Sequence, residues 1–128
     1  MAHHFPVRVY YEDTDMAGIV YHANYLRYIE RARSDWVRSL GIDQNALRDA
    51  GRVFVVRRIE SDFLAPARFD DELDVVTETA QASGARLVLH QEVRRAGERL
   101  FQAEVTVVCV TLDGVPQRLP EELRRPLH

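Results

Sequence analysis

Three carboxylate side chains, Glu12, Asp13 and Asp15, stand between a strand-like segment and a helix-like segment near the N-terminus. Gly18 follows shortly afterwards and supplies the backbone freedom that a tight turn requires. The first N–H groups of a helix have no partner inside it and carry the positive end of its dipole, so the amides near His22 can polarise a carbonyl oxygen. A carboxylate base beside such donors is an arrangement suited to acyl transfer.

Taken by themselves, these residues also fit structural roles. Acidic side chains before a helix are commonly helix caps or solvated charges, and His22 can satisfy a backbone carbonyl instead of contacting a substrate. A metal site is disfavoured, because strand parity directs Glu12 to the face opposite Asp13 and Asp15. No HExxH or cysteine spacing accompanies the group. We therefore expect no metal.

The elements that must position these residues follow from the hydrophobic pattern. Residues 6–12 alternate as a strand, and residues 13–18 break the pattern as a loop. Apolar side chains then recur every three to four residues, which predicts a long, largely enclosed helix between an Asn24 N-cap and Gly41. Asp43 predicts the cap of a second, shorter helix. The apolar positions of the long helix are Tyr25, Ile29, Ala32, Trp36 and Leu40.

The remaining sequence predicts four strands joined by short connections, at residues 53–64, 73–80, 86–93 and 101–109. One strand, one long helix and then four strands indicate an α+β fold with an antiparallel sheet of about five strands wrapped around one central helix. We expect a single domain over residues 1–128 with loosely ordered ends at 1–5 and 115–128. A curved sheet leaves an edge, which dimerisation can cover.

Composition excludes several kinds of chemistry and partner. All 17 basic residues are arginine, so Schiff-base chemistry and a lysine general base are excluded. The net charge of -3 argues against nucleic acid as a partner. Cys109 lies in an apolar run, which predicts a buried, inert thiol and fits a reducing compartment. No run approaches the roughly 18 apolar residues of a membrane span, and no signal peptide is evident, so a cytoplasmic protein is expected.

The chain resembles a known family over nearly its whole length from Val7. The segments that carry the resemblance are residues 11–15, 18–25, 30–33, 54–58, 65–71 and 103–110. They are similar to the signature of the 4-hydroxybenzoyl-CoA thioesterase family, and within it to the Tol-Pal-associated acyl-CoA thioesterase subfamily. The resemblance implies a hotdog fold, a homodimer or a homotetramer of two dimers, active sites at the subunit interface, and neither cofactor nor metal.

The resemblance also implies roles for individual residues. The family's catalytic aspartate falls on Asp15, either as a nucleophile that forms an acyl-enzyme anhydride or as a general base for water. The amide that polarises the thioester carbonyl falls on His22, and the side chains of His22 and Tyr11 match site residues of the subfamily. Residues 56–61 of a partner subunit are expected opposite Asp15. The other motif residues, expected to bind substrate, are Gly18, Tyr21, Asn24 and Tyr25.

The leading hypothesis is hydrolysis of the thioester of a short-chain or aromatic acyl-CoA to the free acid and CoA. One alternative is an isomerase with a cystatin-like cone fold, which also curls a sheet around a helix and uses an aspartate base. A single long helix after the first strand favours the hotdog fold, because the cone fold usually opens with helices. The other alternative is a non-catalytic acyl-binding or scaffold protein associated peripherally with the cell envelope, which predicts binding without turnover.

Overall fold

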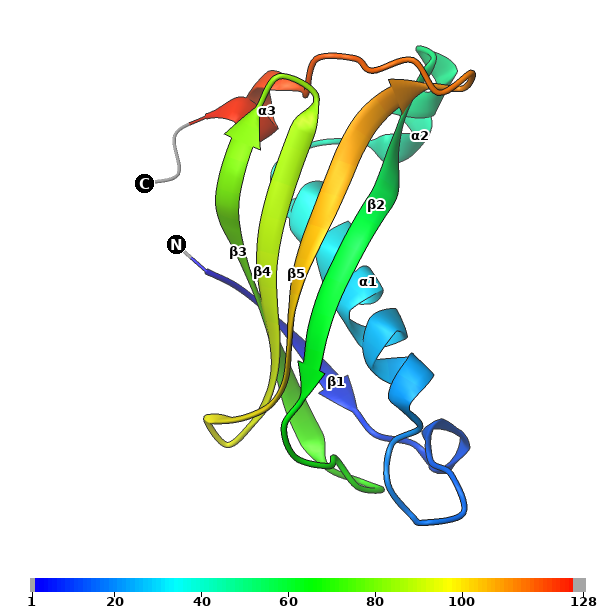
Figure 1. The fold of residues 1–128 in the computed structure, drawn as a ribbon, viewed down its shortest axis with the longest axis vertical. Coiled ribbons are helices and arrows are strands. Elements are labelled where there is room, and N and C mark those ends of the chain that lie inside the picture. Colours follow the sequence, from blue (N-terminus) through cyan, green and yellow to red (C-terminus); the bar gives the residue numbers. More distant parts are fainter. Residues whose placement is uncertain (1, 126–128) are drawn as a thin grey trace.

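The computed structural model describes residues 2–125 as one five-stranded antiparallel sheet with a long helix across one of its faces (Figure 1). The strands are β1 (His3–Arg8), β2 (Arg52–Phe63), β3 (Glu72–Ser83), β4 (Arg86–Arg95) and β5 (Glu98–Thr111). The helices are α1 (His22–Ser39), α2 (Gln44–Asp49) and α3 (Glu121–Arg124), with a short 3-10 helix at Tyr11–Asp13. The strand order is β1-β3-β4-β5-β2, so β1 and β2 form the two edges. The predicted α+β hotdog architecture is confirmed.

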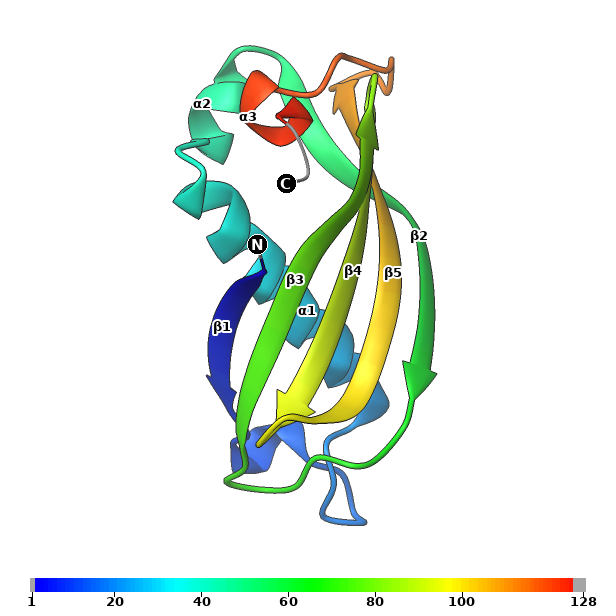
Figure 2. The ribbon, with the colours of Figure 1, turned by 90° about the vertical axis from the view of Figure 1, so that its left-hand side faces the viewer.

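The core lies between α1 and one face of the sheet. Strand register places Val75, Val93 and Phe101 side by side on β3, β4 and β5, and all three are fully buried. Tyr28 and Ile29 of α1 pack into the same cluster. Each apolar side chain of this size contributes about 1.5–3 kcal/mol when it is fully buried. Figure 2 shows α1 along one face of the sheet. Because side chains alternate along a strand, the residues between the core positions face away from α1.

One face of α1 is open to solvent, which corrects the prediction of a largely enclosed helix. Tyr25 and Ile29 are buried, whereas Leu26, one position further along, is 39% exposed. The helix contacts β1, β3 and β4, and a single sheet layer can cover only one side of a helix. The widened apolar face of α1 therefore leaves apolar surface exposed on this chain.

The start of α1 lies before the predicted cap. His22 is the first helical residue and Tyr21 occupies the N-cap position without a side-chain cap. Asn24 is buried inside the first turn, where its side-chain amide donates to the Asp13 carbonyl oxygen at 2.8 Å. The asparagine was thus correctly expected near the helix start, but it fastens the preceding loop instead of capping the helix.

The other helix boundaries follow the sequence. Gly41, with φ +86°, ends α1 in the left-handed conformation that glycine adopts without strain. The Asp43 carboxylate accepts hydrogen bonds from the amides of Asn45 and Ala46 at 2.9 and 3.2 Å, as a cap of α2 should. Burial raises the pKa of the Cys109 thiol, which agrees with the predicted inert cysteine.

Both ends of the described chain contact the sheet, and the loosely ordered ends expected at residues 1–5 and 115–128 stay a prediction. β1 begins at His3 and pairs with β3, so the strand predicted at residues 6–12 starts and ends earlier. Leu119 and Leu123 are 1% and 3% exposed, and Pro116 forms a bridge with β5. Backbone pairing connects residues 3–5 to β3, and apolar burial places Leu119 and Leu123 in the core. Residues 1 and 126–128 lie outside the described part of the chain.

Candidate active site

The loop that carries Asp15 is folded by main-chain hydrogen bonds. The Asp15 amide donates to the Ile19 carbonyl oxygen at 2.9 Å, and the Gly18 amide donates to the Asp15 carbonyl oxygen at 3.0 Å. Gly18 has φ +78°, a left-handed conformation in which a side chain is strained. The Asp15 Oδ1 atom accepts a hydrogen bond from the Ala17 amide at 2.9 Å. One carboxylate oxygen is therefore fixed by the turn, while Oδ2 has no partner among the described residues.

A second loop, after β2, holds the Asp15 loop from the side. The Val20 amide donates to the Ala67 carbonyl oxygen at 2.8 Å, and Ile19 bridges to Arg68. In return, the Ala67 amide donates to the Tyr25 hydroxyl oxygen at 3.0 Å. These contacts bring the segment before α1 and the segment after β2 together at one end of the sheet, as Figure 1 shows at the bottom of the view.

The N-terminus of α1 presents free amides at the same place. The Asn24 amide donates to the Tyr21 carbonyl oxygen at 2.8 Å, so hydrogen bonding of the first turn begins there. The amides of His22 and Ala23 come earlier and have no possible partner inside the helix. Together with the other orphan amides they carry about half a positive charge, which favours an oxygen that gains negative charge.

Asp15 and His22 line one open hollow of about 430 Å³. Its walls combine the Asp15 loop, the first turn of α1, the end of β2 and the loop that follows β2. One carboxylate and one imidazole thus stand in a mostly apolar setting, which is the usual composition of a small-molecule site. The complete lining is Asp15, Ile19, Val20, His22, Tyr25, Phe63, Leu64, Ala65 and Pro66.

Aromatic rings form one wall of this hollow. The Phe63 ring centroid lies 5.7 Å from that of Tyr25 and 6.2 Å from that of His22, both edge to face. Tyr25 stacks on Phe101 with 5.0 Å between centroids, which anchors the wall in the core. Burial raises the pKa of the Tyr25 hydroxyl, so it stays neutral at physiological pH. Phe63 itself is 53% exposed and forms the rim.

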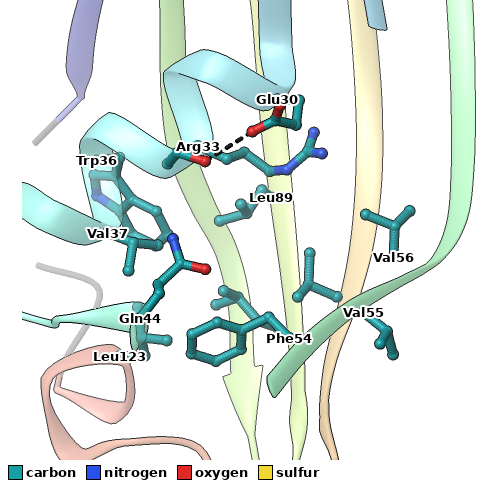
Figure 3. Close-up of a pocket in the computed structure, with 13 residues that line it drawn as sticks. Glu30, Arg33, Trp36, Val37, Gln44, Phe54, Val55, Val56, Leu89 and Leu123 are labelled. Carbon is teal, nitrogen blue, oxygen red and sulfur yellow. Dashed lines mark hydrogen bonds between the residues drawn. The ribbon is translucent and has the colours of Figure 1, made fainter. Parts of the chain in front are cut away.

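A second cavity of about 180 Å³ lies near the C-terminal end of α1, between that helix, β2 and α3 (Figure 3). Arg33 reaches it and donates to the Gln91 Oε1 atom at 3.0 Å, and burial lowers the pKa of the Arg33 guanidinium. Glu30 also lines it and accepts a hydrogen bond from Ser34 at 2.7 Å. This cavity includes no histidine, and at the helix start beside it, that of α2, the Asp43 carboxylate caps the amides of Asn45 and Ala46, so the Asp15 hollow is the candidate active site.

Comparison with known proteins decides the family. Residues 9–127 match the model of the thioesterase-like superfamily. This chain belongs to that superfamily. The acyl-CoA thioesterase YbgC of Haemophilus influenzae is 41% identical over 126 residues, which cover 97% of this chain and 93% of that protein. The acyl-CoA thioester hydrolase YbgC of Escherichia coli is 45% identical over 121 residues, which cover 93% and 90%.

Solved structures of thioesterase-like proteins share the architecture. A probable thioesterase from Bartonella henselae is 37% identical with a TM-score of 0.89, and the match covers 94% of this chain and 100% of that one. A 1,4-dihydroxy-2-naphthoyl-CoA thioesterase from Synechocystis is 27% identical, also with a TM-score of 0.89, over 97% of this chain and 93% of that one. The cone-fold isomerase alternative is thereby excluded.

In this thioesterase-like protein, three of the residues singled out in the sequence meet at the hollow: Asp15, His22 and Tyr25. The other four, Tyr11, Gly18, Tyr21 and Asn24, are not part of its lining. Tyr11 is 81% exposed beside Phe69, and the Tyr21 ring lies 4.5 Å from that of His22. Gly18 shapes the loop and Asn24 fastens it. A direct role of these four with substrate stays a prediction.

The wall formed by Phe63, Leu64, Ala65 and Pro66 was not found from the sequence. The sequence did show that a strand ends there and that a proline-containing turn follows. It did not show that this turn crosses to the Asp15 loop, because that contact joins segments far apart in the chain. Residues 56–61, expected to face Asp15 from a partner subunit, lie on the edge strand β2.

Among residues 2–125, no helix is long and apolar enough to cross a membrane. Within the same residues, no group of three or more histidine, cysteine, aspartate and glutamate side chains is arranged to hold a metal ion.

Proposed function

We propose that this protein hydrolyses the thioester bond of an acyl-CoA, with Asp15 as the catalytic carboxylate. The observation that carries the proposal is the meeting of Asp15, His22 and the N-terminus of α1 at one hollow. The relatives from Haemophilus influenzae and Escherichia coli, which bear the names acyl-CoA thioesterase and acyl-CoA thioester hydrolase, support the same chemistry.

The amide of His22 receives the carbonyl oxygen of the thioester, on which negative charge develops as the carbon is attacked. The Ala17 amide holds Oδ1 of Asp15 and leaves Oδ2 for the reaction. Oδ2 either attacks the carbonyl carbon, which forms an anhydride and expels the CoA thiolate, or takes a proton from water that attacks instead. In both routes one water is consumed, and the free acid and the CoA thiol are released.

The acyl group is short or aromatic. The hollow is apolar apart from Asp15 and His22, and the Phe63 and Tyr25 rings present flat surfaces beside the reacting groups. Aromatic rings stack favourably on such walls, with edge-to-face or offset contacts worth about 0.5–1.5 kcal/mol. The Synechocystis neighbour, named for a naphthoyl-CoA substrate, supports an aromatic acyl group.

A second copy of the chain completes the site. β2 pairs with β5 on one side only, and Val55 and Val56 on this 12-residue edge strand are exposed. Exposed edges of this length invite pairing with another chain. Antiparallel pairing of two β2 strands would bring residues 56–61 of one copy toward the Asp15 hollow of the other.

The family resemblance also predicts that dimers pair into tetramers. It further predicts a location in the cytoplasm and peripheral association with the Tol-Pal envelope machinery.

The replacement Asp15→Asn tests the catalytic role. The purified variant should release thiol from benzoyl-CoA and butyryl-CoA at a rate lower by about 10² to 10⁴-fold, since loss of a catalytic acid or base costs that much. Asp49→Asn, on the exposed end of α2, is the matched control and should keep the wild-type rate. Near-normal turnover by Asp15→Asn would contradict the proposed catalytic role of Asp15. Trapping with hydroxylamine separates the two routes, because only the anhydride yields an Asp15 hydroxamate.

A further inference from the structure

Arginine side chains converge on the face of the sheet turned away from α1. A hollow of about 290 Å³ there is lined by Arg57, Arg58, Arg86 and Thr106. Thr106 lies on this face because its two neighbours in β5 belong to the core on the other side. Three strands contribute to the hollow: β2 supplies two arginines, β4 the third and β5 the hydroxyl. Within one chain, it therefore shares no lining residue with the Asp15 hollow.

The convergence depends on an irregularity in β2. Val56 pairs with Val107 and Arg58 pairs with Thr106, which leaves Arg57 as an extra residue with no partner in β5. In a regular strand, consecutive side chains point to opposite faces, so the sheet would separate Arg57 from Arg58. A β-bulge lets two consecutive residues oppose one and re-aims their side chains. Here both Arg57 and Arg58 line the same hollow.

Register across the sheet brings the third arginine close. Thr106 pairs with Arg58 on one side and with Val88 on the other. Arg86 lies two residues before Val88 on β4, and therefore on the same face. Diagonal neighbours on one face are about 7–8 Å apart, which is within reach of long side chains.

The positive charge of this cluster is only partly compensated. Arg58 forms a salt bridge with Glu60 at 3.3 Å, and both side chains are well exposed. Within residues 2–125, Arg57 and Arg86 form no salt bridge. Like charges placed together on a sheet repel and are destabilising. A bound anion would relieve that repulsion, and guanidinium groups match phosphate through paired, charge-assisted hydrogen bonds.

We propose that Arg57, Arg58, Arg86 and Thr106 form a phosphate-binding site for a small phosphate-bearing molecule. Convergence on one hollow suits a compact phosphate or diphosphate better than an extended lipid surface. The site stands on its own contacts and does not depend on the proposed hydrolysis. The phosphates of an acyl-CoA substrate are one source of the ligand, and only that choice rests on the proposed function.

Calorimetric titration with inorganic pyrophosphate tests the site. Wild-type protein should bind it, and the double variant Arg57→Gln/Arg86→Gln should bind at least about tenfold more weakly, since charged hydrogen bonds are lost. The control is Arg48→Gln/Arg125→Gln, which removes the same charge at exposed positions elsewhere and should bind as wild type does. Thermal unfolding checks that both variants fold. Absence of binding by the wild type, or equal weakening in the two double variants, would overturn the site.

Kinetics identify the source of the phosphate. If the site variant raises KM for benzoyl-CoA but not for the phosphate-free benzoyl-pantetheine, the ligand is the CoA substrate. If KM is unchanged while pyrophosphate binding is lost, the site stands and serves another phosphate-bearing molecule. Binding to phosphatidylglycerol vesicles without binding of pyrophosphate would contradict the proposal in favour of a membrane surface. If the protein hydrolysed no thioester, the proposed function would be refuted. The pyrophosphate titration would still decide whether this phosphate site exists.

Discussion

The Asp15 hollow and the second cavity, both along α1, differ in how their polar side chains are held. At the N-terminal end, the Asp15 carboxylate is exposed and held by main-chain bonds from its own loop. Beside the second cavity, Arg33 donates a hydrogen bond to Gln91, which is fully buried and whose side chain also donates to the Ile29 carbonyl oxygen and the Thr77 hydroxyl. The first arrangement positions the proposed catalytic carboxylate without burying it, whereas the second connects α1 to β3 and β4 through hydrogen bonds. Changes at the first should cost activity, and changes at the second should cost stability.

The largest effect on stability is expected for Gln91→Leu. The substitution leaves the half-buried Arg33 guanidinium without its acceptor and frees a buried carbonyl and hydroxyl, which should lower the free energy of unfolding by about 2–4 kcal/mol. Gln81→Leu, at an exposed position of β3, is the control and should change it by less than about 0.5 kcal/mol. Chemical denaturation measures both. A Gln91 variant as stable as the control would show that this network contributes nothing.

A smaller, mixed effect is expected for Gly18→Ala. An added methyl group meets no atom within 4 Å, so the cost is the strain of a left-handed residue, about 1 kcal/mol. Gly114→Ala carries the same strain at φ +87°, far along the chain from Asp15. Both variants should lose similar stability, but only Gly18→Ala should also lose activity, by roughly tenfold, because its turn orients Asp15. Equal activity in the two variants would show that the turn at Gly18 does not affect catalysis.

The smallest effect concerns the loop after β2. Partial burial raises the pKa of Asp71, but hydrogen bonds from the Arg68 amide and from Arg95, both at 2.8 Å, outweigh it and lower the pKa overall. A lowered folded pKa gives stability that is present above the unfolded value of about 3.9 and lost as pH falls through the folded one. Asp71→Asn should therefore destabilise by less than about 1 kcal/mol at pH 7, with the difference shrinking below about pH 4. Thermal unfolding of wild type and Asp71→Asn from pH 7 to below pH 4 measures this difference in stability. A difference that stays the same at every pH would contradict the link to the Asp71 pKa.

The order of the elements was predictable because hydrophobic periods are local. The alternation that predicted residues 101–109 as a strand and the Asp43 cap both depend on neighbours in the sequence, and both are present. The open face of α1 was not predictable, because it depends on how far one sheet can wrap. The bulge at Arg57 also escaped notice, since alternation looks continuous on either side of it.

The candidate site was predictable at its two polar side chains, Asp15 and His22, and not at its walls. Asp15 and His22 follow from a loop beside a helix start and from the family resemblance, and the structure places both at one hollow. Phe63 and Pro66 were missed, because they reach the hollow only through the packing of the loop after β2 on the loop before α1. Sequence patterns depend on residues that are close in the chain, whereas this wall is formed by a tertiary contact between two distant loops.

The position of His22 allows its amide to be tested separately from its side chain. His22 is the first residue of α1, where proline is tolerated, and Tyr21 before it has the extended backbone (φ -62°, ψ 132°) that a following proline requires. His22→Pro therefore removes the N–H group without removing the helix. His22→Ala is the control, because it loses the imidazole and keeps the amide.

The decisive measurement is the turnover of benzoyl-CoA by these two variants, with circular dichroism to verify that both are folded. We expect His22→Pro to lower kcat by a further factor on the order of 10² to 10³ relative to His22→Ala, the usual loss when an oxyanion donor is removed. Equal kcat in the two variants would contradict the role of the helix N-terminus in binding the thioester oxygen.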